Sequence, residues 1–136
     1  MEKKAEYQVS SFANEGVLEI VVKGEITEKT YKNVTDEVNA IIKENNAKKA
    51  IADFRALERR IEPSEMYRYF RNYESNLFDI QYAIVDLPEN VQYKTAAINA
   101  GLHSLMWFTD MDAARKWIKN NDRSNRYHHS NGNPQF

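Results

Sequence analysis

Six side chains near the middle of the sequence have the chemistry to bind a partner or a ligand. They are three arginines followed by three tyrosines: Arg55, Arg59, Arg60, Tyr67, Tyr69 and Tyr73. Guanidinium groups form charge-assisted, often two-pronged hydrogen bonds to carboxylates and phosphates. The arginines follow a strand-like run, and ligands of open α/β sheets bind beyond the carboxyl ends of strands. They are candidates to hold an anion or an acidic partner surface, or else simply to pair with Glu58 and Glu62.

The tyrosines lie in a segment whose apolar residues have helical spacing. The apolar stripe of this helix is formed by Met66, Phe70, Tyr73 and Leu77. Tyr67 and Tyr69 fall away from the stripe, so one buried face cannot hold every aromatic ring. Exposed aromatic rings mixed with arginine are enriched at protein interfaces, and phenol groups also suit the rim of an apolar pocket. The alternative is that the rings pack over the edge of the sheet.

Catalytic and metal-binding motifs of the common classes are missing from the sequence. The chain has no cysteine, which excludes disulfides, thiolate metal sites and cysteine nucleophiles. The histidines lack metal-site spacing, and no Gly-x-Ser-x-Gly motif or phosphate-binding glycine loop occurs. Three aspartates each follow a predicted strand, namely Asp53, Asp86 and Asp110. Such a cluster could bind Mg²⁺, but turn and cap roles explain it more simply. We therefore expect no enzyme, no metal site and no cofactor.

Composition narrows the class of protein. The 136 residues suit one domain, and 42% hydrophobic with 29% charged residues is an ordinary globular mixture. A net charge of −1 argues against a nucleic-acid-binding protein, which needs a positively charged face. No segment approaches the ~20 apolar residues of a membrane-spanning helix, and the N-terminus has no signal-peptide core. We expect a cytoplasmic protein that is not transmembrane.

The elements that must position these residues begin with a hairpin. Residues 7–12 and 17–22 have the composition of strands, and Asn14-Glu15-Gly16 between them supplies a turn, which predicts an antiparallel pair. Thr27 is a candidate N-cap for the helix that follows, and Asn45-Asn46 ends it. The apolar stripe of this first helix consists of Tyr31, Val34, Val38, Ile41 and Ile42.

Three further strands are predicted at residues 50–54, 81–85 and 105–108, each followed by a helix. A charged connector, residues 55–62, leads into the second helix, where Pro63 fits the first turn. Gly101 is expected to terminate the third helix and Asp110 to cap the last one. One face of the third helix carries Val91, Thr95, Ile98 and Leu102. The inward residues of the last helix are Met111, Ala114, Trp117 and Ile118.

This order predicts an α/β fold in which an N-terminal antiparallel hairpin joins a mostly parallel sheet of about five strands, with four helices. Strands joined through helices run parallel because the crossovers are right-handed. Residues 1–120 are expected to form a single domain. Residues 121–136 are polar, can bury little, and are expected to be a disordered tail.

Four segments occur in a recognisable order: GVLEIVVKGEIT at 16–27, NAKKAIADFR at 46–55, YAIVD at 82–86 and FTDMDAARKWI at 108–118. Together they resemble the SpoIIAA-like branch of the STAS domains, the fold of bacterial anti-sigma-factor antagonists. The resemblance extends from Tyr7 to Lys119. It implies a STAS/SpoIIAA-like fold and a non-enzymatic regulatory or ligand-binding module.

In the antagonist group, the resemblance implies a phosphorylated Ser or Thr at the start of the second helix, within an Asp-Ser-Ser-Gly-like motif. This chain has Ile61-Glu62-Pro63-Ser64-Glu65-Met66 there, and only Ser64 matches by type and position. A phosphate on Ser64 would meet the positive end of the helix. Glu62 and Glu65 would repel it, so Ser64 is a candidate whose surroundings differ from the motif.

Two functions are compatible with these observations. The first is a regulatory module that docks an unknown protein partner through the second helix and the preceding loop, with a homodimer through the same helix as a variant. The alternative is a carrier or sensor of a lipid or another small apolar or anionic ligand, by analogy with the CRAL-TRIO domains. A carrier requires an enclosed cavity of about 300 Å³ or more, whereas a docking module requires exposed aromatic rings near Tyr67 and Tyr69.

Overall fold

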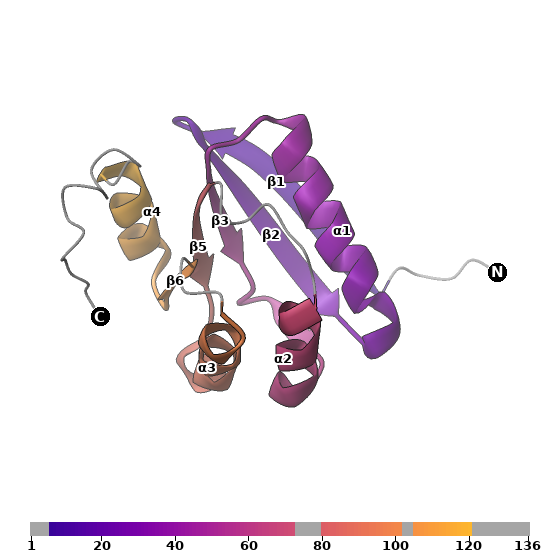
Figure 1. Ribbon diagram of the computed structural model, residues 1–136. Helices are drawn as coiled ribbons and strands as arrows, with labels where there is room; N and C mark the ends of the chain where they lie inside the picture. The colour runs from indigo at the N-terminus through magenta and orange to yellow at the C-terminus, as the bar shows by residue number, and fades with distance from the viewer. Residues whose placement is uncertain (1–5, 73–79, 102–104, 121–136) are drawn as a thin grey trace.

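The computed structural model describes residues 6–72, 80–101 and 105–120, which form a six-stranded sheet with helices on both faces (Figure 1). The strands in sheet order are β1 (Tyr7–Asn14), β2 (Val17–Glu25), β3 (Lys49–Asp53), β5 (Gln81–Val85) and β6 (Leu105–Phe108). The sixth strand, β4 (Leu57–Arg59), pairs with the end of β2. β1 and β2 are antiparallel and every other pair is parallel, which confirms the predicted fold class.

The hairpin depends on residues with positive φ angles. Glu15 and Gly16, the two loop residues, have φ angles of 53° and 85°, and two-residue hairpin loops require positive φ at both positions. At the far end of the hairpin, Gly24 has a φ of 99° and lies opposite Tyr7. A Cβ atom at Gly24 would lie 2.5 Å from the Glu6 carbonyl oxygen, so only glycine allows the strands to approach there.

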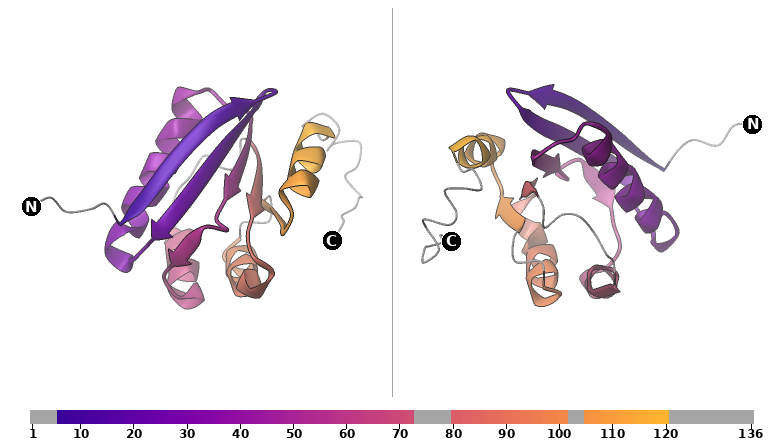
Figure 2. Two further views of the ribbon diagram at one scale, coloured as in Figure 1. Left: turned by 180° about the vertical axis from the view of Figure 1, so that it is seen from behind. Right: turned by 45° about the horizontal axis from the view of Figure 1, so that its top comes forward.

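Three helices cover one face of the sheet and one helix covers the other (Figures 1 and 2). The first face carries α1 (Glu28–Glu44), α2 (Pro63–Asn72) and α3 (Val91–Asn99); the second carries α4 (Met111–Asn120). A short 3-10 turn, η2 (Pro88–Asn90), precedes α3. Within the described ranges, no helix combines the length and the apolar character that spanning a membrane requires.

Local signals at the first helix are confirmed. The Thr30 backbone N–H donates to the Thr27 hydroxyl, and the Thr27 N–H donates to the Thr30 hydroxyl at 2.9 Å, so the two residues form a capping box. The helix ends at Asn45, its C-cap, and Asn46 follows with a φ of 51°. The buried residues of the helix match the predicted stripe: Tyr31, Val34, Val38 and Ile42.

Each face of the sheet has its own apolar cluster. The larger cluster joins α1, α2 and α3 to the sheet, whereas the smaller one joins α4 to β2, β3 and β5. On α4, Ala114 and Ile118 are completely buried, and Met111 and Trp117 pack beside them. The Ala113 N–H donates to the Asp110 carboxylate at 2.9 Å, which confirms the predicted cap and the predicted inward face.

In the middle of the chain one expectation is wrong, and the direction of one helix face was not predicted. The connector 55–62 contains a strand, β4, because β2 extends past the end of β3 and leaves backbone groups at Gly24 and Glu25 for pairing. The predicted apolar face of α3 points to solvent, with Val91 58% and Ile98 36% exposed. Its buried face holds Tyr93, Ala96 and Ala97 instead.

An ion pair fixes α4 to the sheet. The guanidinium of Arg115 donates two hydrogen bonds of 2.8 Å to the Glu19 carboxylate on β2, and the Asn14 amide donates a third at 3.1 Å. The Glu19 side chain is only 3% exposed. The hydrogen bonds from Arg115 lower the pKa of Glu19 below its ordinary value, and burial opposes them.

Acidification is expected to remove the contribution of this pair. A depressed folded-state pKa stabilises the fold above the unfolded pKa, roughly pH 4.3, and that stabilisation is lost as the pH falls through the folded-state pKa. Arg115→Ala should therefore cost about 1–2 kcal/mol at pH 7 and less at pH 3, as measured by urea unfolding. The exposed neighbour Lys116→Ala is the control. An equal loss for Arg115→Ala at both pH values would contradict the assignment.

Candidate functional site

The guanidinium of Arg60 lies inside the protein, where it pairs with Asp86. Its Nη1 and Nη2 atoms donate to the two carboxylate oxygens at 2.9 and 2.8 Å, and the two side chains are only 8% and 5% exposed. The same guanidinium lies 4.5 Å from the ring centre of Tyr93 and 5.9 Å from that of Phe54. The contacts of Arg60 are therefore structural: an ion pair with Asp86 and two aromatic rings near its planar group.

Asp86 and Tyr93 extend this contact to neighbouring elements. The Asp86 carboxylate also accepts hydrogen bonds from the Leu87 N–H at 2.8 Å and the Asn90 amide at 3.0 Å. The Tyr93 hydroxyl donates to the Ile61 carbonyl at 2.6 Å. We call this set of contacts between Arg60, Ile61, Asp86 and Tyr93 the clamp. It ties the segment that enters α2 to the end of β5 and to α3.

The other two arginines lie elsewhere. Arg55 forms two side-chain hydrogen bonds to the Asp53 carboxylate, at 3.0 and 2.9 Å, and its backbone N–H donates a third at 3.0 Å. The charges of Asp110 and Arg115 influence the pKa of Arg55. Arg55 therefore lies toward α4 and not toward α2. Arg59 is exposed on β4, with its carbonyl accepting from the Ile26 N–H at 2.8 Å. The three arginines therefore do not form one anion site.

The α2 tyrosines have different environments. The Tyr69 ring packs against Tyr31 with 4.7 Å between ring centres, and its hydroxyl donates to the Glu28 carbonyl at 3.5 Å. Tyr67 is half-buried and Arg68, beside it, is exposed. Tyr73 lies outside the described residues. Tyr69 therefore joins α2 to α1.

Ser64 is exposed in the first turn of α2, as its position after Pro63 suggested. Its surroundings are acidic: the Glu62 N–H donates to the Glu65 carboxylate at 3.3 Å. Hydrogen bonding and charge repulsion from Glu65 also raise the pKa of Glu28 on α1. A phosphate on Ser64 would therefore enter a region that already holds three carboxylates.

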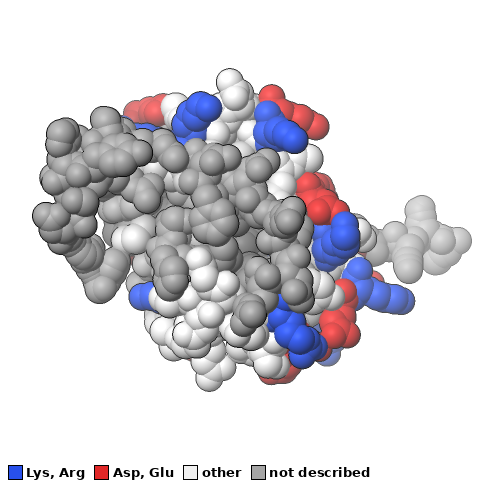
Figure 3. All heavy atoms as spheres, viewed as in Figure 1, with Lys and Arg blue, Asp and Glu red and all other residues white. Residues whose placement is uncertain are grey.

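The exposed side of α3 is a feature whose environment sequence reasoning did not assign. Val91 and Ile98 are solvent-exposed on a helix that packs beside α2. Figure 3 shows a surface over α3 that is mostly free of charge, whereas lysines, arginines and acids intermix over α1. The signal was present in the apolar stripe, but a stripe indicates an interface as readily as a core.

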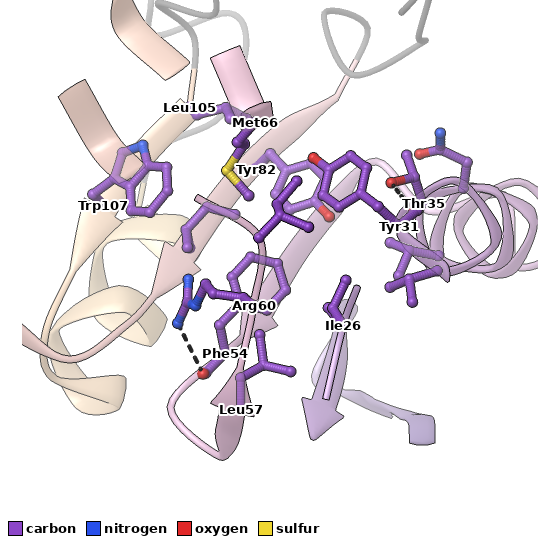
Figure 4. A pocket seen from close by; sticks show the side chains of 15 residues that line it. Ile26, Tyr31, Thr35, Phe54, Leu57, Arg60, Met66, Tyr82, Leu105 and Trp107 are labelled. Carbon is purple, nitrogen blue, oxygen red and sulfur yellow. Dashed lines mark hydrogen bonds between the residues drawn. The ribbon is translucent and has the colours of Figure 1, made fainter. Parts of the chain in front are cut away.

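A cavity of about 100 Å³ lies between α1, α2 and the sheet (Figure 4). Side chains from α1, α2, β5 and β6 form its walls, and Arg60 and Phe54 lie at one side. This volume is about a third of the roughly 300 Å³ at which ordinary ligand pockets begin. We therefore do not propose that the protein carries a lipid.

The three aspartates that follow strands serve separate purposes. Asp53 pairs with Arg55, Asp86 belongs to the clamp and Asp110 caps α4. Over the described ranges, no three His, Asp or Glu side chains are grouped so that they could hold a metal ion. The predicted cap role is confirmed for Asp110, whereas Asp53 and Asp86 also hold ion pairs, with Arg55 and Arg60, that the turn and cap prediction did not include.

Comparisons with known proteins identify the fold. No known protein family and no curated protein matches the sequence. An anti-sigma factor antagonist from Mycobacterium paratuberculosis is similar in structure, with a TM-score of 0.60 and 14% identity over 84% of this chain and 95% of that one. An uncharacterized DUF3478-family protein from Shewanella loihica PV-4 matches with a TM-score of 0.54 and 14% identity, over 87% of this chain and 98% of that one. The latter is described as having a SpoIIAA-like fold. The described chain therefore has a SpoIIAA-like fold.

Proposed function

We propose that this protein is a non-enzymatic regulatory module of the SpoIIAA-like STAS type that docks a protein partner through α2 and the loop before it. The fold shared with an anti-sigma factor antagonist supports a regulatory role. The observation that carries the proposal is the exposed, uncharged side of α3, which extends the α2 surface with Val91 and Ile98. Apolar residues gathered beside a half-buried tyrosine and exposed arginines have the composition of an interface.

The clamp gives this surface a fixed shape. Arg60 and Ile61 precede α2 directly, and both are held by residues at the end of β5 and on α3. A surface that is already ordered loses less conformational entropy when a partner binds. We therefore define the docking surface as Arg59, Ser64, Tyr67, Val91 and Ile98. Arg60 and Tyr69 support this surface from the protein interior, through Asp86 and α1. Arg55 lies outside it and pairs with Asp53 at the end of β3.

Replacing Val91 by aspartate is expected to abolish partner capture, since it places a charge at the centre of an apolar contact. Tyr67→Ala should weaken capture about tenfold or more, as loss of an anchoring aromatic side chain typically does. Tagged variants would be expressed in the native cells and cross-linked, and the co-purified proteins quantified by mass spectrometry against the wild type.

The matched control is Phe12→Asp. Phe12 is 50% exposed on β1, so this change introduces the same charge at a comparably exposed apolar residue that lies outside the docking surface. Circular dichroism would confirm that all three variants fold. If Val91→Asp and Tyr67→Ala captured the wild-type set of partners while Phe12→Asp did not, docking would occur on the hairpin and the proposal would be wrong.

A further inference from the structure

The cavity beneath α1 and α2 is a second candidate binding site. Protein interiors are packed as densely as organic crystals and contain few voids larger than a water molecule. This void measures about 100 Å³ and borders the larger apolar cluster of the protein. Figure 4 shows Trp107 on one side and Tyr31 on the other, with Met66 and Tyr82 between them. Its walls are almost entirely apolar.

One hydrogen-bond donor at the cavity wall has no partner. The Nε1 atom of Trp107 is buried, and it finds no acceptor in the part of the chain that the structure describes. An indole N–H can only donate, and buried donors are nearly always bonded. Other polar groups of the wall are already used: Arg60 contacts Asp86 and the Phe54 carbonyl, and the Thr35 hydroxyl donates to the Tyr31 carbonyl.

The occupant that fits these walls is neither water nor an ion. A buried water molecule needs two to four polar partners, and among the buried side-chain polar atoms of the described wall residues only Trp107 Nε1 lacks a hydrogen-bond partner. The positive charge of Arg60 is already compensated by Asp86, so an anion would have to compete with a buried ion pair. Benzene, with six non-hydrogen atoms, occupies a cavity of 150 Å³ in a known case, so about 100 Å³ accommodates roughly four or five non-hydrogen atoms.

We infer that this cavity binds a small, uncharged, mainly apolar molecule that carries one hydrogen-bond acceptor. The indole N–H of Trp107 donates to that acceptor. The site lies between Tyr31 of α1 and Met66 of α2, so its occupant contacts the underside of the helix in the proposed docking surface. The inference about the ligand does not depend on that proposed function, because binding is measured without a protein partner.

Cyclobutanone and methylenecyclobutane are suitable probes, since they have the same shape and only the ketone has an acceptor. The chain contains two tryptophans, so a ¹⁵N-labelled sample gives two indole signals, which Trp117→Phe assigns. Cyclobutanone is expected to shift the Trp107 signal saturably, with a dissociation constant on the order of 1 mM, and to leave the signal of Trp117 on α4 unmoved. Methylenecyclobutane should bind about fivefold more weakly, the effect of one hydrogen bond.

Trp107→Phe keeps an aromatic wall and removes the donor, so it should bind both probes with equal affinity, as followed by the methyl signal of Met66. Val34→Phe fills the cavity from α1 and should abolish binding of both. Three outcomes for the wild-type protein would each overturn the inference: no saturable shift at Trp107, equal affinity for the two probes, or equal shifts at both tryptophans. These wild-type measurements remain decisive even if a variant does not fold.

Discussion

Replacing Arg60 by alanine is expected to lower the free energy of unfolding by about 3–5 kcal/mol, because Asp86 is left as a buried charge without its partner. Most domains have only about 5–15 kcal/mol of stability in total, so the loss would be conspicuous in a urea unfolding curve followed by circular dichroism. The entry into α2 would also lose its anchor. Partner capture is therefore expected to weaken even though no exposed residue of the docking surface has changed.

The neighbouring arginine provides the control. Arg59 is exposed, and Arg59→Ala should change the free energy of unfolding by about 0.5 kcal/mol or less. Arg60→Ala combined with Asp86→Ala should cost less than the sum of the two single changes, because the second removes the charge that the first left unpaired. If Arg60→Ala cost no more than Arg59→Ala, the clamp would not be a structural element of the protein.

Replacing Ile118 by alanine is expected to cost about 2–5 kcal/mol, the range for large-to-small changes in a packed core. Ile118 is completely buried and belongs to the small cluster between α4 and the sheet, together with Val17, Ile51 and Val85. Because the cluster is small, few other contacts can compensate for the cavity. Thermal unfolding would measure the loss, and Trp117, whose ring lies 5.9 Å from that of Phe108, would report the packing of α4 by its fluorescence.

Ile98→Ala is the matched control for this change. It removes the same atoms from a helix, but Ile98 is 36% exposed on α3, so its loss should be about 1 kcal/mol or less. Comparable losses for the two substitutions would mean that α4 contributes little to the stability of the sheet. In that case the core would reside in the larger cluster alone.

Much of the fold could be predicted because its signals are local. Thr27 and the stripe from Tyr31 to Ile42 lie within about four turns of one helix, so cap and spacing could be recognised together. Glu15-Gly16 fixes the hairpin within a few residues of both strands. Parallel pairing of β2, β3, β5 and β6 followed from the alternation of strands and helices, because right-handed crossovers leave few other arrangements.

The errors concern contacts between distant segments. β4 exists only because β2 is longer than β3, and a charged segment such as Leu57–Arg59 has no strong strand signal of its own. The direction of the α3 face could not be predicted because Tyr93 is drawn inward by Ile61 and Arg60, which lie more than 30 residues earlier. An apolar stripe records which residues share a face of the helix, not which side of the helix is covered.

In the candidate site too, local features could be predicted and contacts between distant residues could not. The exposure of Ser64 in the first turn of α2 followed from Pro63. The pairing of Arg60 with Asp86, 26 residues away, could not be predicted, because an arginine in a charged connector is equally suited to solvent, a ligand or a buried partner. Trp107 was predicted only as part of a core strand, because the lack of a hydrogen-bond acceptor for its indole N–H depends on the shape of the cavity.

The order of strands in the sheet bears on how the protein is made. From β1 through β2, β3 and β5 to β6, the spatial order follows the order of the chain. During synthesis the N-terminal part of a chain leaves the ribosome first, so each new strand emerges when the edge it pairs with has already been translated. No strand has to be inserted between two that are already paired. The growing edge can move steadily across the sheet until α4, translated after every strand, covers the apolar face that has remained open to solvent.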